Sequence, residues 1–337
     1  MSDPRSTFGD MQAYARISNP CQRDWTLAAT SLLRCRAIVS ARTPIYLRGW
    51  LAAMELAERR ISYLHLQSPA TLDCVNPPFN SLLICRSGAL HLQLGAASAV
   101  CLQPGESLAL AAGQSVQLVI PQQAGLLWLQ WDADAPAHAQ ALCRAALVAE
   151  TEAFLMALRY SADHDQAVLR TERFMAFLET GGASPAERIA DVADRRLDRV
   201  LALIEQQSHG DFDLAGLARD AAMSERNLFY LMKSTVGMTP YRCYQRLRLI
   251  RARRGIVDCL AEHAGVSWHA ANQGFSHLGR FASVYRTHFG ELPSETQAWL
   301  TQLRESAHLL DGRPGKSDAR AISKNRSRCG VAPTQCE

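Results

Sequence analysis

The sequence lacks the features that mark several classes of protein. Its 337 residues contain no run of 18 apolar residues, which a membrane-spanning helix would need. The opening stretch MSDPRSTFGDMQ carries acidic side chains and no apolar segment, so we expect no secretory leader. Apolar residues make up 48% of the chain and charged residues 20%, which excludes wholesale disorder. The composition predicts a soluble, cytoplasmic protein of about two domains, without membrane association.

Closely spaced cysteines are missing as well. None of the ten cysteines lies two to four residues from another, which is the spacing of a zinc knuckle. A chain of this length that is not exported needs no disulfide framework. We therefore expect mostly buried, reduced thiols.

Positive charge is scarce in the N-terminal part. Residues 1–194 hold 15 basic and 18 acidic side chains, residues 195–310 hold 15 and 11, and residues 311–337 hold 6 and 3. The formal net charge of +4 therefore comes from the C-terminal part alone. Such an asymmetry is typical of a protein in which one domain meets an anionic partner and the other does not.

Short apolar runs separated by turn residues occupy residues 61–131. The expected strands cover Arg60–Leu66, Leu82–Cys85, Ala89–Leu94, Ala99–Leu102, Leu108–Ala111, Val116–Ile120 and Leu126–Trp131. Six or seven strands at this spacing, with no helical pattern between them, favour an antiparallel sandwich or barrel.

The pattern changes to helical after residue 135. Ala137–Tyr160 and Gln166–Glu179 indicate two amphipathic helices. One face of the first helix is expected to carry Leu142, Ala146, Ala149, Ala153 and Met156. A Gly-Gly-Ala-Ser-Pro break places a domain boundary between about 181 and 195. The expected division is a β-domain over 1–135, a helical dimerisation segment and linker over 136–194, a helical domain over 195–300 and a basic, disordered tail over 301–337.

Residues 195–300 predict a helical domain with an internal repeat. A stripe of Leu197, Val200, Leu201 and Ile204 marks a first helix, and Asp213 and Ser224 are good N-caps for two more that form a helix-turn-helix. An offset of 52 or 53 residues superposes this unit on a second one. The matched pairs are Ala218/Ala270, Ala222/Gly274, Met223/Phe275, Ser224/Ser276, Leu228/Phe281, Lys233/Arg286, Gly237/Gly290 and Pro240/Pro293.

A linker helix is expected between the two units. Thr239 and Pro240 supply its N-cap and first turn, and it runs to about Gly255. Its residues span about 25 Å at 1.5 Å each. With the flanking turns, the two recognition helices would lie about 34 Å apart, one turn of DNA. A single chain could then read two successive major-groove segments.

Two long motifs in this domain resemble the AraC/XylS family of transcription regulators. They are FSHLGRFASVYRTHFGELPSE, from Phe275 to Glu295, and AAMSERNLFYLMKSTVGMTP, from Ala221 to Pro240. The first is similar to the XylS-like branch in particular. The segment Ser267–Gln273, with Trp268 and His269, is more polar than the family pattern. This departure puts the stability of that helix in question, not the fold.

The candidate DNA contacts follow from the outward face of each recognition helix. In the first unit they are Arg226, Asn227, Phe229, Tyr230 and Lys233, of which the resemblance places Arg226 and Tyr230 where bases are read. An alternative for Phe229 is packing against the linker helix. In the second unit they are His277, Gly279, Arg280, Ser283 and Arg286, with a capping or solvent-exposed role as the alternative for His277. Arg can bind guanine edges, whereas Lys233 and Arg286 suit phosphates.

Most arginines of the linker helix are expected to be solvated, with one or two meeting the DNA backbone or polymerase. They are Arg242, Arg246, Arg248, Arg251, Arg253 and Arg254.

The family resemblance also implies a cupin-like sensor in the N-terminal part. A metal-bearing barrel needs a His-x-His pair followed by Glu, but His65 and His91 are isolated, so we expect no metal, no cofactor and no enzyme. Alternation puts Ile61, Tyr63 and His65 on one face, which lines a pocket, is exposed to solvent or packs against a helix. Tyr63, His65 and Trp131 are the candidate effector contacts.

The resulting expectation is an α+β protein that regulates transcription. An N-terminal cupin-like β-barrel with helices precedes an all-α domain of two helix-turn-helix units joined by a linker helix. Its expected partners are double-stranded promoter DNA, RNA polymerase, a small-molecule effector and a second copy in a homodimer. The resemblance implies that the effector is aromatic and that the protein activates catabolic genes. The alternative is a ligand-independent regulator whose barrel is a docking and dimerisation module.

Overall fold

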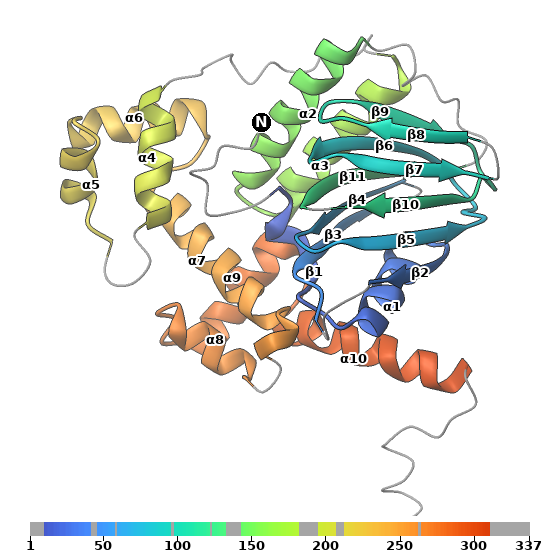
Figure 1. Cartoon of the computed structure of the whole chain (residues 1–337). Helices are drawn as coiled ribbons and strands as arrows, with labels where there is room; N and C mark the ends of the chain where they lie inside the picture. Colours follow the sequence, from blue (N-terminus) through green and yellow to red (C-terminus); the bar gives the residue numbers. More distant parts are fainter. Residues whose placement is uncertain are drawn as a thin grey trace, which may run out of the picture.

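The computed structural model describes residues 10–41, 46–57, 59–95, 98–121, 123–132, 143–181, 195–206, 212–261 and 264–310. A β-domain of two sheets lies beside a domain made of helices alone (Figure 1). The expected α+β two-domain class is therefore confirmed. No helix within these ranges is long and apolar enough to cross a membrane.

Two antiparallel sheets form the β-domain. One has the strand order β1-β3-β4-β11-β6-β9 and the other β2-β5-β10-β7-β8. The strands are β1 (Ala15–Ser18), β2 (Arg36–Ser40), β3 (Gly49–Leu56), β4 (Arg59–Leu66), β5 (Ala70–Val75), β6 (Asn80–Ser87), β7 (Leu90–Leu94), β8 (Ser98–Leu102), β9 (Ser107–Leu110), β10 (Val116–Ile120) and β11 (Ala124–Trp131). All seven strands expected between residues 60 and 131 are present. The sequence pattern missed β1, β2, β3 and β5.

The space between the two sheets is filled by one apolar core. Leu64 and Trp128 from the six-stranded sheet meet Leu72 and Leu118 from the five-stranded sheet. Helix α1 (Gln22–Leu32) adds Trp25, which is fully buried and donates a hydrogen bond to the Leu47 carbonyl at 3.3 Å. The inward residues alternate with outward ones along each strand, so each sheet presents a second face.

Helices α2 (Arg144–Arg159) and α3 (His164–Glu179) cover the outer face of the six-stranded sheet. Phe154 and Phe174 stack with ring centroids 4.3 Å apart and join Ile61 and Leu129 in a second core. The expected face of α2 is wrong: its buried positions are Leu147, Thr151, Phe154, Leu155, Ala157 and Leu158. Met156 is 47% exposed and Ala149 is exposed as well, because the bulkier side chains, not the alanines, turn toward the sheet. Leu142 lies outside the described residues.

Seven helices in the described part of the chain follow. They are α4 (Arg195–Gln206), α5 (Leu214–Asp220), α6 (Glu225–Thr235), α7 (Pro240–Ile256), α8 (Val266–Asn272), α9 (Leu278–Phe289) and α10 (Pro293–Leu310). Asp213, Ser224 and Thr239 cap α5, α6 and α7 through their side chains, as expected.

The repeat is visible in the backbone. Ala222 and Gly274, paired by the sequence offset, both adopt left-handed conformations, with φ of 55° and 73°. Gly237 and Gly290 both have φ of 77° and lie between the recognition helix and the helix that follows it. Ala218 and Ala270 are both buried where the helices of each unit cross.

The C-terminal boundary differs from the expected one. The basic tail was placed at 301–337, but α10 continues to Leu310. Trp299 and Leu300 pack against the inter-sheet core, which explains why the helix extends beyond the family motif. Residues 311–337 lie outside the described ranges. The expected boundary at 181–195 also falls there, except for residues 181 and 195 themselves.

The second helix-turn-helix unit is docked on the β-domain. The buried Arg253 guanidinium of α7 forms an ion pair with Glu291 at 2.7 Å and donates to the Ala15 carbonyl of β1 at 3.1 Å. Glu291 also pairs with Arg16 of β1. Arg304 of α10 binds Asp24 of α1 at 2.9 Å. In Figure 1, α10 runs beside α1 and β1 and α9 lies next to α3, whereas α4–α6 extend away from the sheets.

Glu291 makes this docking sensitive to acid. Burial alone would raise the pKa of its carboxyl group, but the guanidinium groups of Arg253 and Arg16 outweigh burial and lower it. A lowered pKa in the folded state means that the carboxylate stabilises the fold above about pH 4.5 and loses that contribution as the pH falls through the folded-state value.

We expect Glu291→Gln to reduce the acid sensitivity of the free energy of unfolding. Urea titrations between pH 7 and pH 3 would show a smaller decrease for the variant than for the wild type. The exposed Glu305 of α10 provides the matched control, because Glu305→Gln should keep the wild-type slope. Equal slopes for Glu291→Gln and the wild type would contradict the role of this ion cluster.

Candidate nucleic-acid interface

Helix α6 is held by its inner face and leaves its outer face open. Leu228 and Met232 are fully buried. The Ser224 hydroxyl accepts a hydrogen bond from the Asn227 backbone N–H at 3.2 Å and fixes where the helix begins. Helix α6 is therefore fixed through its buried side, and its opposite side faces solvent.

The outer face of α6 carries all five of the expected residues. Arg226, Asn227, Phe229, Tyr230 and Lys233 are exposed. The Arg226 guanidinium lies 5.6 Å from the centroid of the Tyr230 ring, a cation–π contact that orients both groups. Phe229 is 42% exposed, and the centroid of its ring lies 6.1 Å from that of Tyr230. Two aromatic rings and a guanidinium thus form one surface.

Helix α9 repeats this arrangement. Phe281, Tyr285 and Phe289 are buried along one side. On the other side the expected residues are all exposed: His277, Gly279, Arg280, Ser283 and Arg286. His277 occupies the N-cap position without a capping hydrogen bond from its side chain. No atom lies within 4 Å of the position a Cβ of Gly279 would take, so the helix surface is open there.

Helix α8 forms despite its polar sequence. His269 and Ala270 are buried while Trp268 is 57% exposed. The His269 ring packs on α7 at Gly255, where a Cβ would lie 2.3 Å from its Nδ1 atom. Burial lowers the pKa of His269, which keeps the imidazole neutral at pH 7. The polar sequence of α8 therefore still forms a packed helix, because the His269 ring occupies the space that a side chain at Gly255 of α7 would take.

The expectation that most of the linker arginines are solvated is wrong, because only Arg242 of the six is exposed. Arg246 and Arg253 are 1% and 2% exposed, and both bind groups of the β-domain and its helices. Arg248 is partly buried and stacks 4.6 Å from the Phe275 ring while its Nε donates to the Gln273 carbonyl. These side chains fasten helices together. Sequence periodicity could not single them out, because arginine is normally found on the surface.

The candidate effector residues do not lie inside the barrel. Tyr63, His65 and Trp131 are buried on the outer face of the six-stranded sheet, which corresponds to the packed alternative. The Tyr63 hydroxyl lies 3.4 Å from Asp10, and the His65 ring stacks on Trp50 at 4.0 Å. Burial lowers the pKa of His65 to about 4 and raises that of Tyr63. The inter-sheet face of β4 is occupied by Leu64 and Leu66 instead.

The exposed faces of α6 and α9 carry guanidinium, hydroxyl, amide and aromatic groups. Guanidinium groups form bidentate hydrogen bonds with guanine edges, hydroxyls and amides bond either base edges or phosphates, and aromatic rings contact thymine methyls. In the described part of the chain, no cluster of three or more His, Cys, Asp or Glu side chains could hold a metal ion.

Comparison with known proteins agrees with this geometry. A family model described as a helix-turn-helix domain matches residues 217–298, which include α6, α7, α8 and α9. The XylDLEGF operon transcriptional activator of Pseudomonas putida is 33% identical over 141 residues, which cover 40% of this chain and 44% of the relative. This chain therefore matches less than half of that relative's length.

Two further matches are more complete. XylDLEGF operon transcriptional activator 2 of Pseudomonas putida is 30% identical over 141 residues, covering 42% of this chain and 87% of that protein. The crystal structure of a probable AraC family transcriptional regulator from Rhodopseudomonas palustris is 31% identical and covers 32% of this chain and 98% of its own, with a TM-score of 0.30. These relatives are transcription regulators and not enzymes. The chain belongs to the AraC/XylS family of DNA-binding transcription regulators.

Proposed function

We propose that this protein is a cytoplasmic activator that binds a promoter through two recognition helices in one chain. The observation that carries the proposal is the pair of exposed surfaces on α6 and α9, each with an arginine near the start of a helix whose other side is buried. Because the linker helix α7 connects the two units, both can engage one face of the duplex.

The two surfaces have different chemistry. In α6, Arg226 and Tyr230 read bases, with Asn227 and Phe229 beside them. In α9, Arg280 and Ser283 read bases, Gly279 lets the backbone approach closely, and His277 meets the backbone of the DNA. Lys233 and Arg286 occupy equivalent positions late in each helix and bind phosphates.

Regulation acts on the position of the second unit. The Arg253–Glu291–Arg16 cluster and the Arg304–Asp24 pair hold that unit on the β-domain, whereas the first unit extends from it. A small-molecule effector would favour the arrangement in which both units bind DNA and contact RNA polymerase, and would thereby activate catabolic genes. Met156 and Leu169 are 47% and 46% exposed on α2 and α3, and these helices would form the homodimer contact.

The alternative is a ligand-independent regulator whose β-domain serves for docking and dimerisation. The filled inter-sheet core favours it over an effector bound inside the barrel, because Trp25 and Trp128 occupy that space. Thermal unfolding in the presence of candidate effectors separates the two functions, since a ligand that binds the folded state raises the midpoint.

Selection of duplexes from a random pool by the full-length protein at physiological salt tests DNA reading. We expect two short half-motifs about ten base pairs apart, because the recognition helices belong to one chain. Recovery of a single half-motif would contradict double reading, and recovery of none would contradict sequence-specific binding.

Arg226→Ala and Arg280→Ala should each weaken binding to the selected duplex by about 1–3 kcal/mol and relax base preference within one half-motif only. The measurement is a competition against duplexes with single base changes. Arg219→Ala, at an exposed arginine of α5, is the matched control. Uniform weakening on all sequences would instead assign the two arginines to phosphates.

Lys233→Gln and Arg286→Gln should weaken binding equally on all duplexes. Each removes about one phosphate contact, so the slope of log affinity against log salt concentration should fall by about one. A change in base preference with an unchanged slope would contradict the phosphate assignment.

A further inference from the structure

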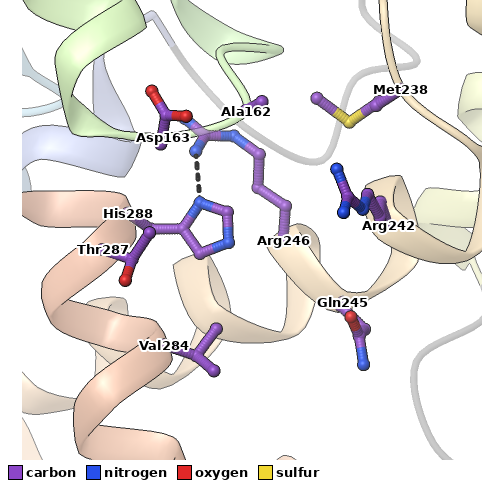
Figure 2. Close-up of a pocket in the computed structure, with 9 residues that line it drawn as sticks. All are labelled: Ala162, Asp163, Met238, Arg242, Gln245, Arg246, Val284, Thr287 and His288. Carbon is purple, nitrogen blue, oxygen red and sulfur yellow. Dashed lines mark hydrogen bonds between the residues drawn. The ribbon is translucent and has the colours of Figure 1, made fainter.

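Two arginines of the linker helix α7 contact the second recognition helix, one near each of its ends. Close to the end of α9, the Nη1 atom of Arg246 lies 3.3 Å from Nδ1 of His288 (Figure 2). Arg246 also donates to the carbonyl group of Arg159 in α2, so it belongs to the contact with the β-domain helices. Arg248 is directed at the turn that joins α8 to α9, just before the recognition helix begins.

The Arg248 guanidinium makes two kinds of contact with this turn. Its Nε atom donates a hydrogen bond to the Gln273 carbonyl at 2.6 Å. Its Cζ atom lies 4.6 Å from the centroid of the Phe275 ring and 5.5 Å from that of the Tyr244 ring on α7. A planar guanidinium can donate from its edge and stack through its face at the same time, which an ammonium group cannot.

Gly274 leaves free the space that the guanidinium occupies. A Cβ atom at this residue would lie 2.6 Å from the Nη2 atom of Arg248. Gly274 has a left-handed φ of 73°, but Ala222, the equivalent residue of the first unit, has a φ of 55° and carries a Cβ atom. The turn therefore accepts alanine, and the contact with Arg248 is a further reason for glycine at position 274.

The two units share this turn but start their recognition helices differently. Equivalent backbone hydrogen bonds close both turns, at 2.9 Å from the N–H of Met223 and at 3.0 Å from that of Phe275. Helix α6 is then capped by the Ser224 side chain, whereas His277, at the N-cap of α9, makes no capping hydrogen bond with its side chain. The start of α9 thus lacks the local contact that fixes the start of α6.

Phe275 connects the arginine to the buried side of α9. The centroid of its ring lies 4.9 Å from that of Phe281, which is 1% exposed and ends the first turn of the helix. Arg280 directly precedes Phe281 and faces solvent. The stack of Arg248, Phe275 and Phe281 therefore sets where the first turn of α9, and with it Arg280, lies relative to α7.

The first unit is built without this stack. The offset of 52 residues places Arg196 of α4 at the position of Arg248, and Met223 at that of Phe275. Arg196 is exposed, whereas Arg248 is partly buried. One unit therefore fixes its recognition helix through a cap within the helix-turn-helix, and the other through a side chain of the linker helix.

We propose that Arg248 is a positioning residue for the second recognition helix. It takes the place of the missing cap by holding the α8–α9 turn against α7, so that α9 begins at a fixed place and angle relative to the linker helix. Arg248 does not contact DNA itself and acts through Arg280 and Ser283. The effect on DNA reading rests on the proposed function, whereas the ordering of the turn does not.

Hydrogen exchange of the full-length protein, measured by mass spectrometry of its peptides, tests the ordering of the turn. In Arg248→Met we expect the backbone N–H groups of residues 273–275 and 281–284 to exchange about tenfold faster, the value of one hydrogen bond to a charged group. Peptides from the α5–α6 turn of the same sample are the internal control and should keep the wild-type rates. Arg242→Met, at the exposed arginine of the same helix, should leave both turns unchanged. Wild-type exchange over residues 273–284, or equal acceleration in both turns, overturns the proposal.

Two further variants separate the geometry of Arg248 from its charge. Gly274→Ala displaces the guanidinium from the other side of the contact, so combining it with Arg248→Met should add little to the effect of either change alone. Arg248→Lys keeps the charge but cannot stack and donate through one plane, so its exchange should match that of Arg248→Met. Additive effects in the double variant, or wild-type exchange in Arg248→Lys, contradict positioning by the guanidinium.

Competition binding to the selected duplex tests the effect on DNA reading. Arg248→Met should relax base preference in the half-motif of the second unit only, with an unchanged slope of log affinity against log salt concentration. A slope that falls by about one would show that Arg248 itself binds a phosphate, and relaxed preference in both half-motifs would show a general loss of structure. Either result overturns the proposal. If the wild type selects no duplex, the proposed function fails, while the exchange measurement still decides whether Arg248 orders the turn.

Discussion

The buried ion pair between Arg253 and Glu291 is the interaction on which the arrangement of the domains depends. Arg253 donates to Glu291, to the Ala15 carbonyl and to the Tyr285 hydroxyl. The Thr296 hydroxyl donates its hydrogen to the Glu291 carboxylate at 2.8 Å, so it accepts a hydrogen bond from the Tyr285 hydroxyl at 2.9 Å. Arg253, Tyr285, Thr296 and Glu291 are thus joined in a closed ring of hydrogen bonds. Because every polar group of the ring is satisfied, a charged pair can remain buried where α7, α9 and α10 meet β1.

This cluster joins one part of the DNA-binding domain to the β-domain. The second unit is attached to the β-domain by α10 as well, through Arg304, Asp24 and the side chains of Trp299 and Leu300. The first unit shares a core with α7 and extends away from the sheets. The second recognition helix therefore lies next to α3, and α10 lies next to α1 and β1.

Several predictions from sequence agree with the structure because they depend on local chemistry. The strands from β6 to β11 alternate in polarity or are bounded by glycine and proline, and the caps at Asp213, Ser224 and Thr239 act within three residues. Strand β3 was missed because six of its eight residues are buried, so it shows no alternation. The outward residues of α6 and α9 were identified for the same local reason, since the apolar spacing of a helix defines its opposite face.

The sequence by itself determined the family, the two repeated units and the residues that face solvent on both recognition helices. Only the tertiary structure decided which face of α2 is buried, that Tyr63 and His65 pack under helices and not in a barrel pocket, and that two of six linker arginines are buried. The physical reason is that burial of a charge depends on acceptors supplied from elsewhere in the chain. Arg246 receives carbonyls from α2, and Arg253 receives Glu291 and Ala15, over separations that no local pattern reports.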